Sequence, residues 1–465
     1  MTSRRRVLQA ILSSGVTAPL ATARPNDPWT EANRIVARIT RPKFPARDFP
    51  ITQFGAIEGG KENGTAAFAQ AIAACANAGG GRVVVPAGRW LTGPIHLKSN
   101  VNLHVARGAT VLFSTDPKDY LPLVLTRWEG VECMNYSPLI YALDQENIAV
   151  TGEGTFDGQA SEAFWWPWKG RREFGFTPGA PDQAPARKKL FAMGEAGTPV
   201  AERVFGEGFY LRPSFFEPYR CKTVLIEGVT IRNTPFWEVH PVLCQSVTVS
   251  GLTIDSAGPN TDGCDPESCR DVLIENTTFN TGDDCIAIKS GRNNDGRRIA
   301  VPCENIVIRG CRMKDGHGGV SIGSEISGGV RNVFVENCRM DSPHLDNAFR
   351  IKNNAMRGGV LENFHFRRIV VGEVAHAVLA IHFNYEEGGN GPYRPVLKGV
   401  HLSSIVSGKS QFGIEAIGLP NAALNDITVE HCAFDHVANG VVMQDVTGVR
   451  FHDLKINGQT VRAPR

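Results

Sequence analysis

A short apolar template that recurs along the chain limits its possible folds more than any other feature. The template reads apolar, any, apolar, two polar or small residues, apolar, any, apolar, and its first clear copy spans residues 224–231. Further copies start at Val247, Val272, Ile306, Val333, Phe364, Val400, Ile427 and Val449. Apolar residues at alternate positions are typical of strands, and the two-residue interruption indicates a corner before the apolar face resumes.

The spacing of these copies separates the repeat architectures. The starts lie 22 to 36 residues apart, which is too irregular for propeller blades, and the copies are too rich in β-branched residues for helical repeats. Constant strands joined by loops of variable length are typical of a solenoid of stacked coils. We therefore predict an all-β, single-stranded parallel β-helix. A β-sandwich with coincidental spacing is the alternative.

Four polar clusters fall at a similar phase of four successive copies. They are Asn-Thr-Asp at 260–262, Gly-Asp-Asp at 282–284, Gly-His-Gly at 316–318 and Arg-Ile-Lys at 350–352. Because equivalent positions of stacked parallel strands lie about 4.8 Å apart, we expect the four clusters on one flank of the solenoid. Asp283 and Asp284 would point to opposite faces of a regular strand, so we expect a bulge or corner beside Gly282.

The chemistry of these residue types points to glycoside hydrolysis. An inverting glycosidase needs one protonated carboxyl and one ionised carboxylate that activates water, and crowded carboxylates raise the pKa of at least one of them. Arg350 and Lys352, two apart on a strand, would face the same way and pair with substrate carboxylates. We therefore expect a hydrolase that acts on an acidic polysaccharide.

The four clusters, in this order and spacing, resemble the polygalacturonase family of glycoside hydrolases. The resemblance extends over residues 49–458, and segments 282–292 and 317–325 resemble the bacterial branch, which contains many exo-acting members. It implies a right-handed, pectin-lyase-like parallel β-helix. It also implies hydrolysis of α-1,4-galacturonosyl links with inversion, and no cofactor or metal.

The resemblance also implies roles for the residues of the clusters. Asp283 would be the general acid, and Asp262 and Asp284 would activate water. His317 would support the acid and the substrate. Arg350 and Lys352 would hold carboxylates near the cleaved bond.

Other candidate substrate-binding residues come from the same clusters or from the neighbouring coils. Asn260 opens the first cluster, Trp237 and His240 lie on the coil before it, and Tyr385 lies on the coil after the last one. A turn or packing role is the alternative for each of them.

The template is absent from residues 160–211, which we interpret as an insertion near the groove. It holds the aromatic run 164–168, followed by Lys169, Arg171 and Arg172. Rings can stack on sugars while cations bind carboxylates, so a wall built here would favour cutting from the chain end. A loop simply packed on the solenoid, with endo action, is the alternative. Before the repeats, residues 63–81 read as a helix, begun by Asn63-Gly64-Thr65 and ended by three glycines, that caps the first coil.

Other functional classes remain open from sequence alone. A calcium-dependent pectate lyase uses the same fold, and an Asp-Asp pair is also common in calcium sites. A solenoid can bind polysaccharide without catalysis. Xylogalacturonan or rhamnogalacturonan could replace homogalacturonan as substrate.

The first 23 residues resemble a twin-arginine signal peptide. Arg4, Arg5 and Arg6 precede a mildly apolar run and a small-residue site at 21–23, and the run is too short to span a bilayer. We expect residues 24–465 to be one exported domain, periplasmic or secreted, without a membrane anchor. Removing this segment, which holds three arginines and no acidic residue, lowers the formal charge from +2 to −1. A polyanionic substrate would then bind through a local basic groove, and nucleic acid is not an expected partner.

The cysteines indicate a core role. Their number is odd, eleven in all, and Cys311, Cys338 and Cys432 fall at the same inward phase. We expect buried free thiols, neither a disulfide framework nor a zinc site, because no cysteine pair has ligand spacing with histidines. The sequence does not define an oligomeric state.

Overall fold

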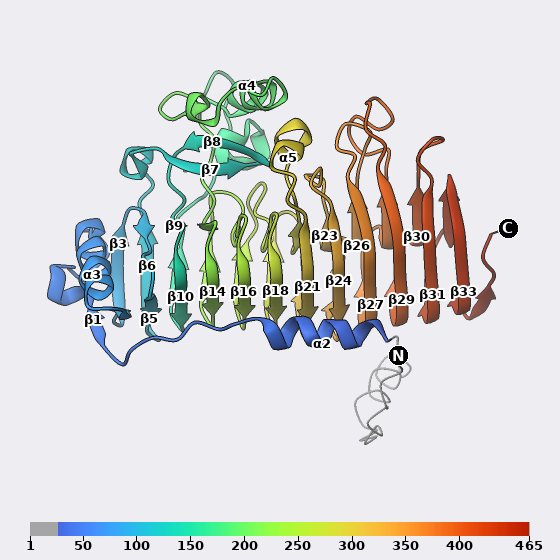
Figure 1. Ribbon diagram of the computed structural model, residues 1–465, viewed down its shortest axis with the longest axis horizontal. Helices are drawn as coiled ribbons and strands as arrows, with labels where there is room; N and C mark the ends of the chain where they lie inside the picture. The colour runs from blue at the N-terminus through green and yellow to red at the C-terminus, as the bar shows by residue number, and fades with distance from the viewer. Residues whose placement is uncertain (1–26, 465) are drawn as a thin grey trace.

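The repeated template forms a parallel β-helix, as predicted. The computed structural model describes residues 27–464, and the strands stack coil upon coil along its length (Figure 1). The first half of each template pairs in parallel in strands β10 (Glu146–Gly152), β14 (Lys222–Glu227), β16 (Gln245–Ser250), β18 (Arg270–Glu275), β21 (Cys303–Arg309) and β24 (Val330–Glu336). Their register aligns Val224 with Val247 and Val247 with Val272, so equivalent template positions meet.

After the corner, a second set of short strands continues each coil. These are β11 (Thr155–Asp157), β15 (Thr230–Arg232), β17 (Thr253–Ser256), β19 (Thr278–Thr281), β22 (Arg312–Met313) and β25 (Arg339–Met340). The corner residues have left-handed backbones, with φ of 80° at Gly228, 52° at Asn276 and 65° at Gly310. Gly and Asn adopt this conformation with little strain, which explains their recurrence in the interruption.

Near the C-terminus the two sets merge into long continuous strands, and the first coils hold shorter ones. The long strands are β27 (Val360–Glu373), β29 (Val396–Lys409), β31 (Leu424–Phe434) and β33 (Val446–Ile456), and β34 (Gln459–Val461) folds back on β33. The first coils comprise β1 (Asp48–Pro50), η1 (Ile51–Phe54), β2 (Gly81–Val85), β3 (Gly88–Thr92), β4 (Ile95–His96), β5 (Val101–Val105), β6 (Ala109–Phe113), η2 (Pro117–Tyr120) and β9 (Ile140–Leu143).

A separate six-stranded sheet carries two of the four polar clusters. Its strands are β20 (Ala287–Ile288), β23 (Gly316–Ile322), β26 (Leu345–Lys352), β28 (Ala377–His382), β30 (Phe412–Ile417) and β32 (Val441–Gln444). The register runs from Ser321 to Arg350, then Ala380, then Glu415. We call this the groove sheet.

The core between the sheets is a set of apolar ladders that includes the cysteines. All eleven cysteines are buried and free, as predicted. Cys221, Cys244 and Cys269 follow one another on adjacent coils. The Cys244 sulfur accepts from the Cys221 N–H at 3.3 Å, and the Cys269 sulfur accepts from the Cys244 N–H at 3.4 Å.

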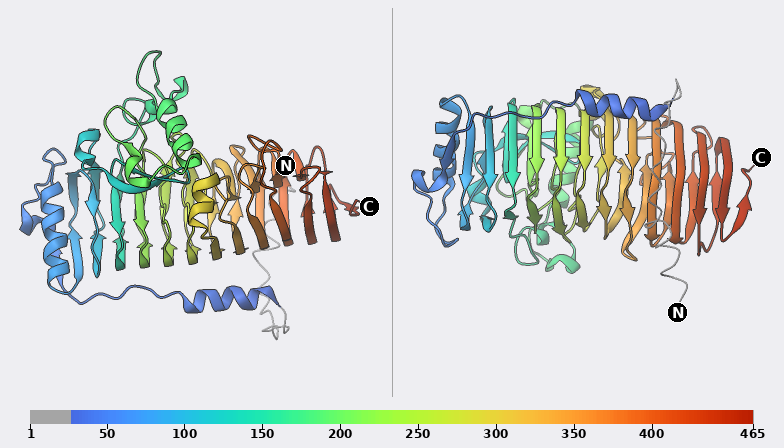
Figure 2. Two further views of the ribbon diagram at one scale, coloured as in Figure 1. Left: turned by 45° about the horizontal axis from the view of Figure 1, so that its top comes forward. Right: turned by 90° about the horizontal axis from the view of Figure 1, so that it is seen from below.

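Within residues 27–464, helices α2 and α3 pack against the coils, and the sequence predicted α3 but not α2. Helix α3 (Thr65–Asn77) caps the first coil, and the Asn63 side chain accepts a hydrogen bond from the Thr65 N–H at 3.0 Å. Helix α2 (Pro28–Arg38) runs along the outside of the template sheet (Figures 1 and 2). It buries Leu273, Val307 and Phe334, which are apolar residues at the outward "any" position of three templates. That outward apolar row was the sequence signal for α2.

Residues between β11 and β13 (Phe216–Tyr219) leave the solenoid and rise above it (Figure 1). They hold η3 (Trp166–Lys169), η4 (Arg172–Phe174), α4 (Ala184–Glu195), η5 (Val200–Glu202) and β12 (Val204–Phe205). Strand β12 pairs with an antiparallel hairpin of β7 (Val124–Trp128) and β8 (Val131–Asn135) that the sequence did not predict. The hairpin and the insertion share a small apolar cluster, which also includes Phe236 and Trp237 of the solenoid. Within residues 27–464, no helix combines the length and apolarity needed to cross a bilayer.

Candidate active site

A pocket of about 600 Å³ lies where the insertion meets the groove sheet. Side chains from all four polar clusters line it on the solenoid side, and Lys169, Arg171, Phe174 and Arg187 line it on the insertion side. The four clusters were expected on one open flank of the solenoid. They line a pocket instead, because the insertion covers part of that flank.

The chain bends at 282–284, between β19 and β20, which resolves the expected difficulty with adjacent aspartates. A Cβ at Gly282 would lie 2.1 Å from the Gly258 carbonyl oxygen, and one at Gly318 would lie 2.9 Å from Asp284 Oδ1. Only glycine permits these close approaches. They let the coils pack tightly enough for Asp283 and Asp284 both to face the pocket.

The three carboxylates of the clusters gather tightly, with one oxygen of each within 4.8 Å of the others. Each has a cationic partner. Lys352 Nζ lies 2.6 Å from Asp284 Oδ2, and Lys289 Nζ lies 3.6 Å from Asp262 Oδ2. His317 Nδ1 lies 2.9 Å from Asp283 Oδ1. These pairs supply the charge balance that a calcium ion would otherwise provide.

The three carboxylates differ in exposure and in hydrogen bonding. The Asp283 side chain is 18% exposed, against 4% for Asp262 and 1% for Asp284. Both oxygens of Asp284 are engaged, because Ser321 Oγ donates to Oδ1 at 2.8 Å while Lys352 donates to Oδ2. Asp262 Oδ1 is buried without a hydrogen-bond partner among the described residues. Asp283 is thus the most open to a substrate, and Asp262 keeps a free acceptor.

Burial and neighbouring charges separate the pKa values of this cluster. Burial, reinforced by Asp265 and Asp283, raises the pKa of Asp262 well above its usual range. Burial would also raise the pKa of Asp283, but the hydrogen bond and charge of His317 outweigh it and lower that pKa. The same hydrogen bond raises the pKa of His317 to about 9. Taken alone, these directions favour the protonated form of Asp262 and His317 and the ionised form of Asp283.

Two pocket cations form no ion pair within residues 27–464, namely Arg350 on the groove sheet and Lys169 on the insertion. The Arg350 and Lys352 side chains face the same way, as expected, since both cationic groups lie 5.8 Å from the centre of the Tyr385 ring. Lys352 is committed to Asp284, whereas Arg350 is free. The pocket therefore presents unpaired positive charge on two sides of the carboxylates.

Asn260 connects the insertion to Asp283. Lys169 Nζ and Arg212 Nη2 donate to Asn260 Oδ1 at 2.7 and 2.9 Å, and the Asn260 amide donates to Asp283 Oδ2 at 3.3 Å. With both donors on Oδ1, the Nδ2 group must face Asp283. Asn260 lines the pocket, as expected, and its orientation depends on the insertion.

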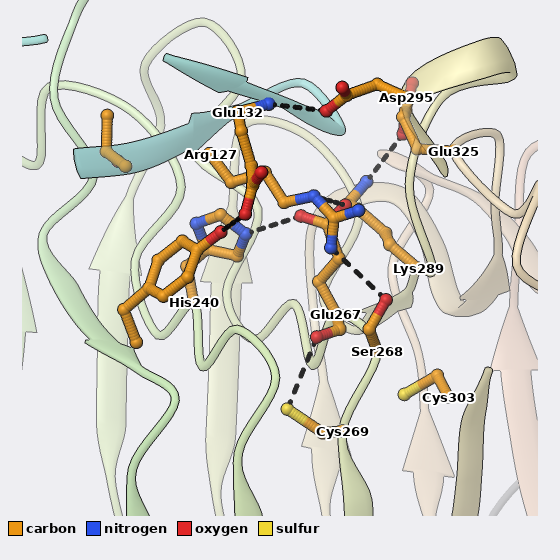
Figure 3. A network of polar contacts seen from close by, with 12 residues as sticks. Arg127, Glu132, His240, Glu267, Ser268, Cys269, Lys289, Asp295, Cys303 and Glu325 are labelled. Carbon is orange, nitrogen blue, oxygen red and sulfur yellow. Dashed lines mark hydrogen bonds and ion pairs between the residues drawn. The ribbon is translucent and has the colours of Figure 1, made fainter. Parts of the chain in front are cut away.

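His240 does not lie on the groove surface, contrary to expectation. It is fully buried, with Nε2 2.9 Å from Glu267 Oε2 (Figure 3). Its Nδ1 lies 3.6 Å from Glu217 Oε2. Burial would lower the pKa of His240, but the hydrogen bonds with Glu217 and Glu267 raise it to about 9. Its ring meets the Trp237 ring edge to face, at 4.8 Å between centroids. His240 thus supports Trp237, which does line the pocket, from below.

The comparison of equivalent positions in successive coils did not identify several charged residues of the site. Lys289 is buried among Asp262, Asp265 and Glu325, and its Nζ lies 4.2 Å from the Trp237 ring centroid. Glu129 and Arg187 form an ion pair at 2.7 Å between the hairpin and α4. Lys289 stands six residues after Asp283, and its backbone forms a parallel β-bridge with Glu267 of the preceding coil. Comparing positions a few residues beyond each polar cluster would therefore have identified Lys289 as a site residue.

Comparisons with known proteins agree with this site. The profile described as "Glycosyl hydrolases family 28" matches residues 208–411, which span all four clusters. A solved structure, described as a hyperthermoactive exopolygalacturonase from Thermotoga maritima, is 43% identical, with a TM-score of 0.91 over 93% of this chain and 97% of that chain. The chain belongs to glycosyl hydrolase family 28.

Relatives in this family have related names. A probable polygalacturonase from Vitis vinifera is 27% identical over 83% of this chain and 74% of its own length. An exo-poly-alpha-D-galacturonosidase from Dickeya chrysanthemi is 26% identical over 74% of this chain and 58% of its own length. The family 28 assignment confirms a glycoside hydrolase, as the four clusters predicted.

Proposed function

We propose that this family 28 enzyme hydrolyses α-1,4-galacturonosyl links of polygalacturonate and works from the chain end. The unpaired Arg350 and Lys169 on either side of the carboxylates carry the substrate assignment, because a neutral sugar would leave both cations unpaired. The names of the relatives in Thermotoga maritima and Dickeya chrysanthemi support the same substrate and an exo action.

The insertion supports exo action physically. Lys169, Arg171, Phe174 and Arg187 line the pocket on the insertion side, and in our proposal they end the groove beside the carboxylates. A polymer end fits such a pocket, whereas the middle of a chain needs an open groove on both sides. Endo cleavage, and hydrolysis of xylogalacturonan or rhamnogalacturonan, are the alternatives.

Asp283 is the proposed general acid, because it is the carboxylate most open to a glycosidic oxygen. Geometry is the first requirement for an acid catalyst. The pKa directions alone would favour the reverse assignment, with Asp262 as acid. In our proposal the proton belongs to the His317–Asp283 pair and crosses their 2.9 Å hydrogen bond to Asp283 as the leaving oxygen enters.

Asp262, assisted by Asp284, is the proposed base. In its ionised form, Asp262 can accept a proton from water at its free Oδ1. Asp284 has no free oxygen with which to attack the sugar. The carboxylates lie closer than the separation of about 6.5–9.5 Å usual for inverting glycosidases. Proton NMR of the first product tests inversion, because the reducing end must appear as the β-anomer.

Residues 1–23, which lie outside the described residues, are the proposed export signal, and 24–465 the proposed catalytic domain, acting in the periplasm or outside the cell. The twin-arginine pattern supports this proposal. Fusing residues 1–30 to a reporter tests it, since substitution of Arg5 and Arg6 by Lys should abolish export.

A product time course on polygalacturonate in chelator tests the activity. Saturated mono- or digalacturonate from the first minutes, without ultraviolet absorbance, is the expected result. A spread of saturated oligomers would make the enzyme endo-acting. Unsaturated products that need calcium would identify a lyase instead, and bound but uncut polymer would identify a binding protein.

A further inference from the structure

A second cluster of charged and imidazole side chains lies on the groove sheet, beyond the pocket. It comprises His376, His382 on β28 and Glu415 on β30. In the register of the sheet, His382 follows Lys352 by one coil and Glu415 follows Arg350 by two. With coils about 4.8 Å apart, Glu415 stands about 10 Å along the groove from Arg350.

Both imidazoles direct the same nitrogen at one carboxylate oxygen. His376 Nε2 lies 2.7 Å and His382 Nε2 lies 2.8 Å from Glu415 Oε2. The side chains are 32%, 19% and 14% exposed respectively, so an ion can reach them from solvent. His376 Nδ1 lies 3.4 Å from Gln411 Oε1. A hydrogen bond on the second ring nitrogen is the usual way that a ligating histidine is oriented.

From this arrangement we propose that His376, His382 and Glu415 form a binding site for a divalent transition-metal cation such as Zn²⁺. Two imidazole nitrogens and one carboxylate oxygen are a common three-ligand set for zinc, with one position open. Bonds of about 2.0–2.2 Å place tetrahedral ligand atoms about 3.3 Å apart. The two distances from the imidazole nitrogens to Glu415 Oε2 are therefore about half an ångström short of that value, and all three ligand atoms lie within 4.8 Å of one another. The expectation of no zinc site considered cysteine pairs only, and this set holds no cysteine.

A bound ion would change the charge of this part of the groove. Without an ion the cluster carries the negative charge of Glu415 near the path of an anionic polymer. A bound dication would reverse that sign.

Isothermal titration of the full chain with ZnCl₂ tests the site. One equivalent is expected to bind, and His382→Gln and Glu415→Gln should each weaken binding at least 10-fold. His431→Ala is the matched control, because His431 forms an exposed pair with Asp453 at 3.4 Å on another face of the coils. It should leave the binding unchanged.

Melting temperature gives a second readout on the same proteins. Zinc should raise it for wild type and for His431→Ala, and should not raise it for the two site variants. No binding by wild type, or binding that survives both site substitutions, would overturn the proposal. Both results are independent of the substrate, so the proposed hydrolase activity is unaffected by either.

Discussion

The interior and the groove of this solenoid are built from the same coils but by different kinds of contact. Inside, residues such as Val249 and Ile274 stack on their equivalents one coil away. In the groove, the partners are separated by one to three coils, as with Asp284 and Lys352, 68 residues apart. Periodicity alone therefore dictates the interior, while the groove depends on which charges meet. Interior substitutions should act mainly on stability, and groove substitutions mainly on turnover.

Lys352→Met should depart most from this division, because a single groove substitution should lower both turnover and stability. Lys352 and Asp284 are 7% and 1% exposed, and removing one member of a buried pair costs about 3–5 kcal/mol because the other charge is left uncompensated. Both turnover and the free energy of unfolding should fall. Urea denaturation and rate assays on Lys352→Met and Lys352→Arg measure the two effects. An unchanged stability in Lys352→Met would show that Asp284 does not depend on this partner.

Arg350→Ala should weaken substrate binding and leave stability unchanged, as expected for a groove residue. Arg350 has no carboxylate partner in the described part of the chain, so its loss should leave the melting temperature unchanged. KM should rise on the order of 10- to 100-fold, as expected for one charged hydrogen bond to a substrate carboxylate. Arg331→Ala, at an exposed ion pair with Glu304 on the opposite sheet, is the control. Equal affinity in Arg350→Ala and wild type would remove Arg350 from the binding site.

His317→Gln should move the alkaline limb of the pH–rate profile to lower pH. The pKa of His317 is raised to about 9 by Asp283, so the pair keeps its proton below that pH, and activity falls as the pH rises through it. In the variant Asp283 must hold the proton alone, and we expect a downward shift of at least about 2 pH units. If the limb stays in place, Asp262 is the better candidate for the acid.

Cys311→Ala should have the smallest effect, and it should lower stability alone. Cys311 is 1% exposed and packs inside the coils, so the small cavity should cost about 1 kcal/mol. Activity at 25 °C should be unchanged, and a chemical-denaturation curve measures the loss. A marked fall in turnover would mean that interior packing reaches the groove.

The sequence predicts the interior well, because a core position needs only the right polarity at the right phase. Val224, Val247 and Val272 could be placed from sequence for this reason. The sequence also predicted that Asp262, Asp283, His317 and Arg350 lie close together, since they occupy similar positions in successive coils.

The sequence predicted the capping helix α3 but not the other elements that cover the coils. The outward apolar row at Leu273, Val307 and Phe334 indicates a covered surface, but it does not show that helix α2, far away in the chain, covers it. Hairpin β7–β8 likewise packs through contacts distant in sequence. His240 shares the phase of groove residues but ends up buried, because Glu217 and Glu267 offer it partners inside.

One paired measurement tests the central claim most directly, namely turnover and melting temperature for Asp283→Asn beside Ile274→Ala. Asp283→Asn should lose on the order of 10²-fold or more in kcat on polygalacturonate and melt like wild type. Ile274→Ala, at a residue that is fully buried, should lose about 2–5 kcal/mol of stability and keep its kcat at 25 °C. An active Asp283→Asn, or an inactive but fully folded Ile274→Ala, would contradict the separation of groove chemistry from core packing.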